Sequence, residues 1–162
     1  MNTDRIEKQI QLRASLHRVW QAVADSTEFG SWFGMKFDGN FVPGTTIRGV
    51  IVPTAADPAV AESQQEYDGL PVEILVLQME PEKLFSFRWH PYAVERDVDY
   101  SAEPTTLVAF TLEEAADGVI LTVTESGFDR IPLARRAKAF AANDEGWAAQ
   151  MKLIGEYLVH AP

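Results

Sequence analysis

The spacing of apolar residues changes once along the chain, near Gly127, and this change limits the fold more than any other feature. Before it, TTLVAFTLEE and VILTVTES are rich in β-branched residues and are joined by Asp117-Gly118, a strong β-hairpin signal. After it, apolar residues recur at helical spacings of three, four or seven: Leu133, Ala137, Phe140, Trp147, Met151, Ile154 and Leu158. The sequence therefore predicts an antiparallel meander followed by one helix of about 28 residues.

The other elements are predicted from alternation, caps and turn residues. Residues 5–14 alternate as a strand, Ser15 is a candidate N-cap for the short helix LHRVWQAVAD, and Asp25 and Ser26 are candidate caps for a second one, TEFGSWF. Further strands are expected in TTIRGVIVP, VEILVLQM and KLFSFRWH. The segment TAADPAVAESQQ, which contains Pro58, is expected to be a mobile loop and a candidate lid.

An antiparallel sheet needs cover on its apolar face, and the C-terminal helix is large enough to supply it. We therefore expect an α+β fold in which a curved sheet of about six to seven strands wraps around that helix. The 162 residues suit a single domain over residues 1–162, because single cores typically form at about 100 to 150 residues. Gly146 costs the helix roughly 1 kcal/mol relative to alanine, so we expect another backbone, a ligand or a kink beside it.

Composition excludes several classes of function. The net charge of −10 disfavours nucleic acid as a partner, because phosphates attract clustered Lys and Arg. The absence of cysteine excludes disulfides and thiolate chemistry and fits a reducing cytoplasm. The start, MNTDRIEKQIQL, lacks the apolar core of a signal peptide, and no run approaches the roughly 20 apolar residues that span a bilayer. We expect a soluble cytoplasmic protein with no membrane partner.

Motifs for metals and cofactors are absent from the sequence. None of His17, His90 and His160 has a second histidine at metal-ligand spacing, so no metal site is expected. The sequence has no nucleophile elbow, no dinucleotide-binding fingerprint and no phosphate-binding loop. No cofactor is therefore expected.

Four stretches, taken in order, resemble a known family: RVWQAVADSTEFGSWFG, LFSFRWHP, TTLVAFTLEEAADGVILTVTESGF and EGWAAQMKLIGEYL. Over nearly its whole length the chain resembles the activator of heat-shock-protein-90 ATPase homologue family, of the START-like or SRPBCC superfamily with the helix-grip fold. The resemblance implies a sheet and a helix that enclose an elongated, mainly apolar cavity. Superfamily relatives bind lipids, sterols, hormones or polyketides, and some are cyclases or other enzymes. The eukaryotic namesake stimulates its chaperone's ATPase with an additional N-terminal domain, of which these residues show no counterpart.

The candidate ligand-binding residues come from the expected inner face of the sheet and from the helix. Phe85, Phe87 and Trp89 alternate along one strand and are expected to meet the helix, either as a pocket lining or as a packed core. Trp32 and Phe33 precede a glycine and are expected at the rim of the cavity. The full candidate set is Trp32, Phe33, Arg48, Phe87, Trp89, Phe110, Glu125, Trp147 and Met151.

Glu125 continues the apolar face of VILTVTES at period two. A carboxylate that faces inward costs stability unless it is paired, so Glu125 could orient a ligand or act as a general base. The alternatives are a salt bridge or a solvated strand end. Arg48 presents the same choice, and an Arg48–Glu125 pair would serve structure as readily as function. His90 is the other candidate for acid–base work.

Three functions remain open at this level. The first is a binding module for a small hydrophobic molecule, with specificity set by Phe87, Trp89, Phe110, Trp147 and Met151. The second is a cyclase- or hydrolase-type enzyme that uses the same cavity, so enzymatic activity is undecided. The third is a module that binds a chaperone or another protein, which a large exposed apolar patch would indicate.

Overall fold

The computed structural model describes residues 4–162, which form a seven-stranded antiparallel sheet with a long helix across one face. The strand order is β1-β7-β6-β5-β4-β3-β2. The strands are β1 (Arg5–Leu12), β2 (Met35–Phe37), β3 (Thr46–Ile51), β4 (Pro71–Glu80), β5 (Leu84–Trp89), β6 (Thr106–Ala115) and β7 (Gly118–Ser126). The helices are α1 (Leu16–Ala24), α2 (Ser26–Phe33), α3 (Pro58–Gln64) and α4 (Leu133–His160), with 3-10 turns at Gln65–Tyr67 and Phe128–Arg130.

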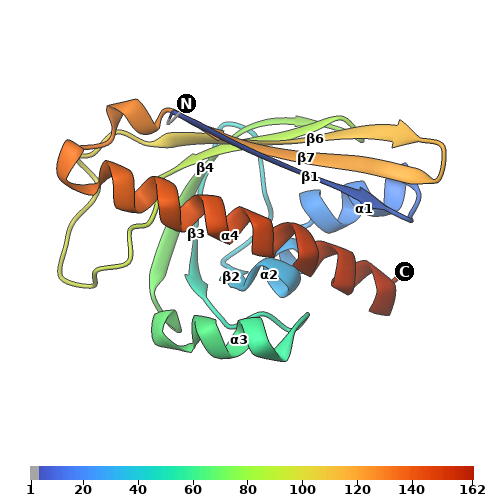
Figure 1. The fold of residues 1–162 in the computed structure, drawn as a ribbon, viewed down its shortest axis with the longest axis horizontal. Helices are drawn as coiled ribbons and strands as arrows, with labels where there is room; N and C mark the ends of the chain where they lie inside the picture. The colour runs from blue at the N-terminus through green and yellow to red at the C-terminus, as the bar shows by residue number, and fades with distance from the viewer. Residues whose placement is uncertain (1–3) are drawn as a thin grey trace.

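The layers follow the expected helix-grip arrangement. Figure 1 shows α4 crossing the sheet, with α1 and α2 beside its C-terminal half and α3 at the lower edge of the view, below β3. The predicted α+β fold, its sheet of six to seven strands and its two short helices after the first strand are confirmed.

The predicted caps start the two short helices. Ser15 Oγ accepts a hydrogen bond from the Arg18 backbone N–H at 3.1 Å. Asp25 Oδ1 accepts from the backbone N–H groups of Thr27 and Glu28 at 2.9 and 3.0 Å. Each cap satisfies N–H groups that a helix leaves without partners in its first turn, so both predicted helix starts are confirmed.

The predicted hairpin between β6 and β7 forms, with its two-residue turn one position before Asp117-Gly118. Ala115 pairs with Gly118 across the two-residue turn Ala116-Asp117. Gly118 has φ +143°, and a Cβ atom there would lie 2.0 Å from the backbone oxygen of Leu12 in β1. The turn therefore needs glycine both for its backbone angle and for the close approach of β1.

Aromatic side chains fill the space between the sheet and α4. Phe85 and Phe87 of β5 and Phe110 of β6 are buried on the inner face, and the Phe110 and Trp147 ring centroids lie 5.7 Å apart. From the other side, α4 buries Trp147 and Met151. The interior is therefore a packed core that is aromatic around Trp147.

The expected loop at TAADPAVAESQQ is wrong over α3, Pro58–Gln64, while the mobility of this segment and its role as a lid stay predictions. Asp57 Oδ1 accepts hydrogen bonds from the Ala59 and Val60 backbone N–H groups at 2.8 and 3.2 Å. Pro58 takes the first helical position, where its fixed φ is favourable and its missing N–H costs nothing. The proline that suggested a loop instead starts a helix.

The expected close approach of another backbone at Gly146 is also wrong, whereas the approach of a ligand there stays a prediction. Helix α4 runs without interruption from Leu133 to His160, and a Cβ atom on Gly146 would meet nothing within 4 Å. The close approach occurs at Gly155, where a Cβ atom would lie 3.4 Å from Ile10 Cδ1 of β1. Gly146 therefore stands in open space, while Gly155 is the glycine that borders another element.

Candidate functional site

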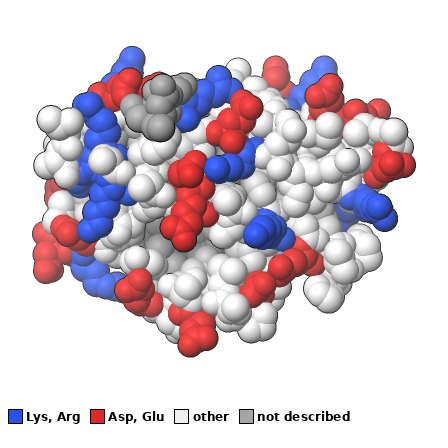
Figure 2. All heavy atoms as spheres, in the orientation of Figure 1, with Lys and Arg blue, Asp and Glu red and all other residues white. Residues whose placement is uncertain are grey.

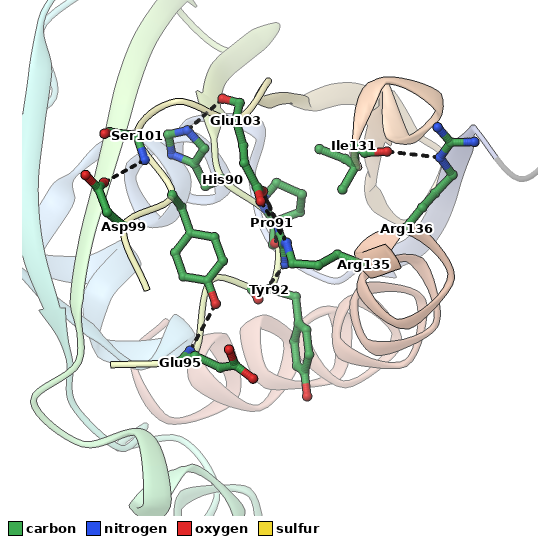
Figure 3. Close-up of polar contacts among 11 residues, drawn as sticks. His90, Pro91, Tyr92, Glu95, Asp99, Ser101, Glu103, Ile131, Arg135 and Arg136 are labelled. Atoms are coloured by element: carbon green, nitrogen blue, oxygen red, sulfur yellow. Dashed lines mark hydrogen bonds and ion pairs between the residues drawn. The ribbon is translucent and has the colours of Figure 1, made fainter. Parts of the chain in front are cut away.

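A long connection, residues 90–105, leaves β5 and returns to β6 beside the N-terminal end of α4 (Figure 1). Arg135 of α4 holds it. The Arg135 guanidinium donates to Glu103 Oε1 at 2.7 Å and to the backbone oxygens of Pro91 and Tyr92 at 3.2 and 3.1 Å (Figure 3). It also lies 4.7 Å from the centre of the Tyr100 ring. A guanidinium suits this role because its planar fork of donors binds several acceptors at once.

The same connection is tied to the segment that follows α3. Arg96 Nη2 donates to the backbone oxygens of Glu66 and Asp68 at 3.3 and 3.1 Å. Tyr67 lies between these two residues, and burial raises its pKa to about 12, with further contributions from Glu66 and Tyr92. Residues 90–105 therefore bridge α4 and the 3-10 turn after α3.

Residues of this connection line a pocket of about 610 Å³. Its apolar walls come from the ends of β2, β3, β4 and β5 and from the connection itself, and include Met35, Ile51, Leu70, Val72, Trp89 and Val98. Exposed charged side chains of both signs also line it, among them Arg96 and Asp99. Helix α4 contributes Asn143. The volume lies within the range of about 300 to 1,000 Å³ that is usual for small-molecule sites.

Glu125 lies next to the pocket residues Trp89 and Asn143 and is fully buried, with 0% of its surface exposed. Its Oε2 accepts hydrogen bonds from Trp89 Nε1 at 2.7 Å and from Thr106 Oγ1 at 2.5 Å. Its Oε1 accepts from Trp147 Nε1 at 2.8 Å and from Asn143 Nδ2 at 2.9 Å. We call these five residues the Glu125 cluster.

The Glu125 cluster joins β5, β6, β7 and α4 at one point. Within residues 4–162, no Lys or Arg side chain is within ion-pair distance of Glu125, so the four neutral donors satisfy its oxygens. The predicted inward orientation of Glu125 is confirmed, while a salt bridge or a solvated strand end is wrong. The arrangement is possible because a buried carboxylate is tolerated when hydrogen bonds fill its acceptor sites.

Arg48 lies outside this cluster. Its side chain is 78% exposed and forms an ion pair with Glu73 at 3.4 Å. The alternation of β3 buries Ile47 and Gly49, so Arg48 points away from the core. Of the two alternatives left open for Arg48, the outward one holds, and no Arg48–Glu125 pair forms, although Arg48 does contribute to the pocket lining.

The remaining candidates divide between the pocket and the core. Trp89 and His90 line the pocket, and a ring nitrogen of His90, Nε2, lies 3.1 Å from the backbone oxygen of Glu103. The other candidates are buried outside the pocket lining: Trp32, Phe33, Phe87, Phe110, Trp147 and Met151. Trp32 is 0% exposed and donates through Nε1 to the Ala22 backbone oxygen at 2.9 Å, so its expected place at a rim is wrong. A part for the core residues in ligand binding stays a prediction.

Sequence reasoning missed Asn143 and Thr106, which complete the Glu125 cluster. A signal for Asn143 was present, because it precedes Trp147 by four residues and so shares its face of the helix. Thr106 pairs directly with Trp89 in the sheet, which the sequence pattern alone does not specify.

With the geometry described, the chain can be compared with known proteins. Residues 13–159 match the family described as "Activator of Hsp90 ATPase homolog 1-like protein". The chain belongs to this family. The resemblance drawn from the four stretches is thereby confirmed. No curated protein matches the chain.

Solved structures share the fold of this family member. A protein from Mesorhizobium loti superposes with a TM-score of 0.70 at 19% identity, over 98% of both chains. The Aha1 protein from Colwellia psychrerythraea, described as a dimer, gives a TM-score of 0.65 at 17% identity, over 94% of this chain and 93% of its own. DynU16, from the dynemicin biosynthetic locus, gives 0.66 at 23% identity, over 96% of this chain but 47% of its own. At these identities the likeness establishes the fold alone.

Some classes of site and surface are not found in the described part of this family member. No group of three or more His, Asp or Glu side chains among residues 4–162 is placed to hold a metal ion. No helix in the same range is long and apolar enough to cross a membrane. Figure 2 shows acidic side chains spread over this face and basic side chains gathered mainly on the left side of the view.

Proposed function

We propose that this protein is a cytoplasmic binding module that holds a small, mainly apolar molecule in the pocket beside Trp89. The observation that carries the proposal is the pocket of about 610 Å³ at the end of the sheet–helix interface, which is lined by apolar side chains, by the rings of Trp89, Tyr92 and Tyr100 and by charged groups. Pockets of this size with a few polar groups among apolar walls are typical of small-molecule sites. The family membership supports a ligand-binding or activator module at the same coarse level.

The proposed site lies at one end of the interface and not along α4. Phe87, Phe110, Trp147 and Met151 pack against one another and against neighbouring rings, so they leave little room for a second molecule. A ligand in the pocket would contact Trp89 and Asn143 directly. These two residues bind the buried Glu125, so they connect the ligand to the core.

A catalytic role for Glu125 receives no support from the geometry. Its oxygens already accept hydrogen bonds from four donors, and the residue is not part of the pocket lining. A general base must come within hydrogen-bond reach of the proton that it removes. A positioning role, in which Glu125 orients Trp89 and Asn143, fits these contacts better.

A surface for a protein partner has no specific support either. The exposed large apolar side chains among residues 4–162 are distributed over the β2–β3 connection, the outer face of β3 and β4, the 90–105 connection and both ends of α4: Val42, Val50, Val52, Leu75, Val98, Leu133 and Val159. Single exposed apolar residues are ordinary, whereas interaction sites expose contiguous patches. The small-molecule proposal is therefore the one that the structure favours.

The test blocks the pocket without changing the outer surface. Val72 lines the pocket, so Val72→Trp should fill it, whereas Leu75→Trp on the opposite face of β4 is a matched control. The probe is 1-naphthol, and the readout is the melting temperature at increasing probe concentration. A ligand at 100 times its Kd stabilises the folded state by about 2.7 kcal/mol. Naphthol should therefore raise the melting temperature of the wild type and Leu75→Trp but not of Val72→Trp. An equal rise in all three would contradict the proposal.

A further inference from the structure

We infer that the bound molecule carries a hydroxyl group, which donates a hydrogen bond to Asn143 Oδ1 in the wall of the pocket. This inference rests on the proposed function and adds the chemical class of the ligand. It follows from the orientation of the Asn143 amide, from its lack of another acceptor partner, and from the polarity of the neighbouring groups.

The Glu125 cluster fixes which way the Asn143 amide points. The indole N–H groups of Trp89 and Trp147 can only donate hydrogen bonds, and they donate to Oε2 and Oε1 of Glu125. Glu125 Oε1 is therefore an acceptor, so the amide nitrogen of Asn143 must face it. The structure shows this arrangement, because Asn143 Nδ2 donates to Glu125 Oε1 at 2.9 Å. The carbonyl oxygen, Oδ1, is then directed away from Glu125.

Asn143 Oδ1 is the acceptor that the cluster leaves unused. Within residues 4–162 no hydrogen bond to this oxygen is formed, and Asn143 is half-buried and lines the pocket. A ligand that covered this oxygen without donating to it would remove it from water with no compensation, which is unfavourable. The site should therefore reject a purely apolar occupant in favour of one with a donor.

The side chain of Trp89 and the second amide hydrogen of Asn143 narrow the chemical class of the ligand further. The N–H of Trp89, which also lines the pocket, is already bound to Glu125 and is not available to a ligand acceptor. Asn143 retains one amide hydrogen beside its free oxygen, because a single contact to Glu125 uses only one of the two. A hydroxyl, which both donates and accepts, matches this pair, so the expected ligand is an apolar alcohol or phenol.

The experiment compares 1-naphthol with 1-methoxynaphthalene by calorimetric titration of the wild type. The two probes share one ring system, but the ether has no donor and carries an additional carbon. A purely apolar pocket would bind the ether more tightly, because additional apolar surface is favourable to bury. One hydrogen bond should outweigh that carbon and give naphthol up to about a threefold lower Kd. The sign of the preference therefore decides the question in the wild type alone.

Two variants assign the preference to Asn143. Asn143→Leu removes the acceptor in the pocket and one donor to Glu125, whereas Thr106→Val removes a donor to Glu125 from a residue that is fully buried outside the pocket lining. The preference for naphthol should disappear in Asn143→Leu and persist in Thr106→Val.

Each of the other results overturns a defined part of the inference. Equal or tighter binding of the ether by the wild type would refute the hydroxyl and leave the apolar binding function standing. A preference that survives in folded Asn143→Leu would refute the role of Asn143. If neither probe binds the wild type, the inference and the proposed function both fail.

Discussion

Replacement of Glu125 by leucine tests whether the Glu125 cluster stabilises the fold. The substitution keeps a side chain of similar size but removes the acceptors of four hydrogen bonds. Trp147 is 3% exposed and Thr106 is 0% exposed, so their donors lose their partners without access to water. Trp89 and Asn143 line the pocket, where water can replace the carboxylate.

The magnitude follows from the two buried donors. A buried donor without a partner costs about 1–3 kcal/mol, which gives about 2–6 kcal/mol for Trp147 and Thr106 together. The removal of a buried carboxylate works in the opposite direction, because its desolvation no longer opposes folding. We expect the donors to dominate and the free energy of unfolding to fall by about 2 kcal/mol or more.

The assay is urea denaturation followed by tryptophan fluorescence and circular dichroism, since coincident transitions justify a two-state analysis. Glu113→Leu is the matched control, because Glu113 is exposed on the neighbouring strand β6 and its replacement should change the free energy by no more than about 0.5 kcal/mol. If Glu125→Leu is as stable as the wild type, or more stable, the carboxylate is an electrostatic burden and the reasoning about its four donors is wrong.

Three further predictions concern other parts of the molecule. Gly146→Ala should raise the free energy of unfolding by about 0.8–1 kcal/mol in urea denaturation, because its methyl group meets no neighbour and alanine favours the helix; a loss of stability would contradict the open space at this position. Burial raises the pKa of Tyr67 to about 12, so its contribution to stability should be complete below about pH 10, the unfolded value, and should be lost between pH 10 and 12. The difference in absorbance at 295 nm between the wild type and Tyr67→Phe should therefore titrate near pH 12, and a midpoint near 10 would refute the effect of burial. Arg135→Met should speed amide hydrogen exchange in residues 91–103 with little change in β6 and β7, because it removes contacts to Glu103 and to two backbone oxygens; unchanged exchange would show that the connection is held by other contacts.

The fold was predictable because its signals are periodic. Alternation in the strands, the caps at Ser15 and Asp25 and the helical spacing after Gly127 each act locally and agree with one another. Asp57-Pro58 carried an equally local signal for α3, but a proline at the first helical position resembles a proline in a loop until the capping contacts are seen.

The site was predictable only in part. Parity along β7 placed Glu125 inward, and parity along β5 placed Trp89 on the same face as Phe87. Parity does not say which face of β3 meets the helix, and this is why the orientation of Arg48 stayed open.

The position of the pocket depends on contacts that no periodic pattern in the sequence predicts. The path of residues 90–105 is fixed by the hydrogen bonds of Arg135 to backbone oxygens and by those of Arg96 on the other side. Backbone oxygens are present at every residue, so the sequence alone does not indicate which of them an arginine binds.

The central claim, that a small molecule binds beside Trp89, is tested most directly by the indole N–H signals of the four tryptophans in a ¹⁵N–¹H spectrum recorded during titration with 1-naphthol. Trp89 lines the pocket, Trp147 shares Glu125 with it, and Trp32 is buried in the core outside the pocket lining. The account predicts a large, saturable shift for Trp89, a smaller one for Trp147 and none for Trp32 or Trp20. Shifts of equal size for all four, or a Trp89 signal that does not move, would contradict it.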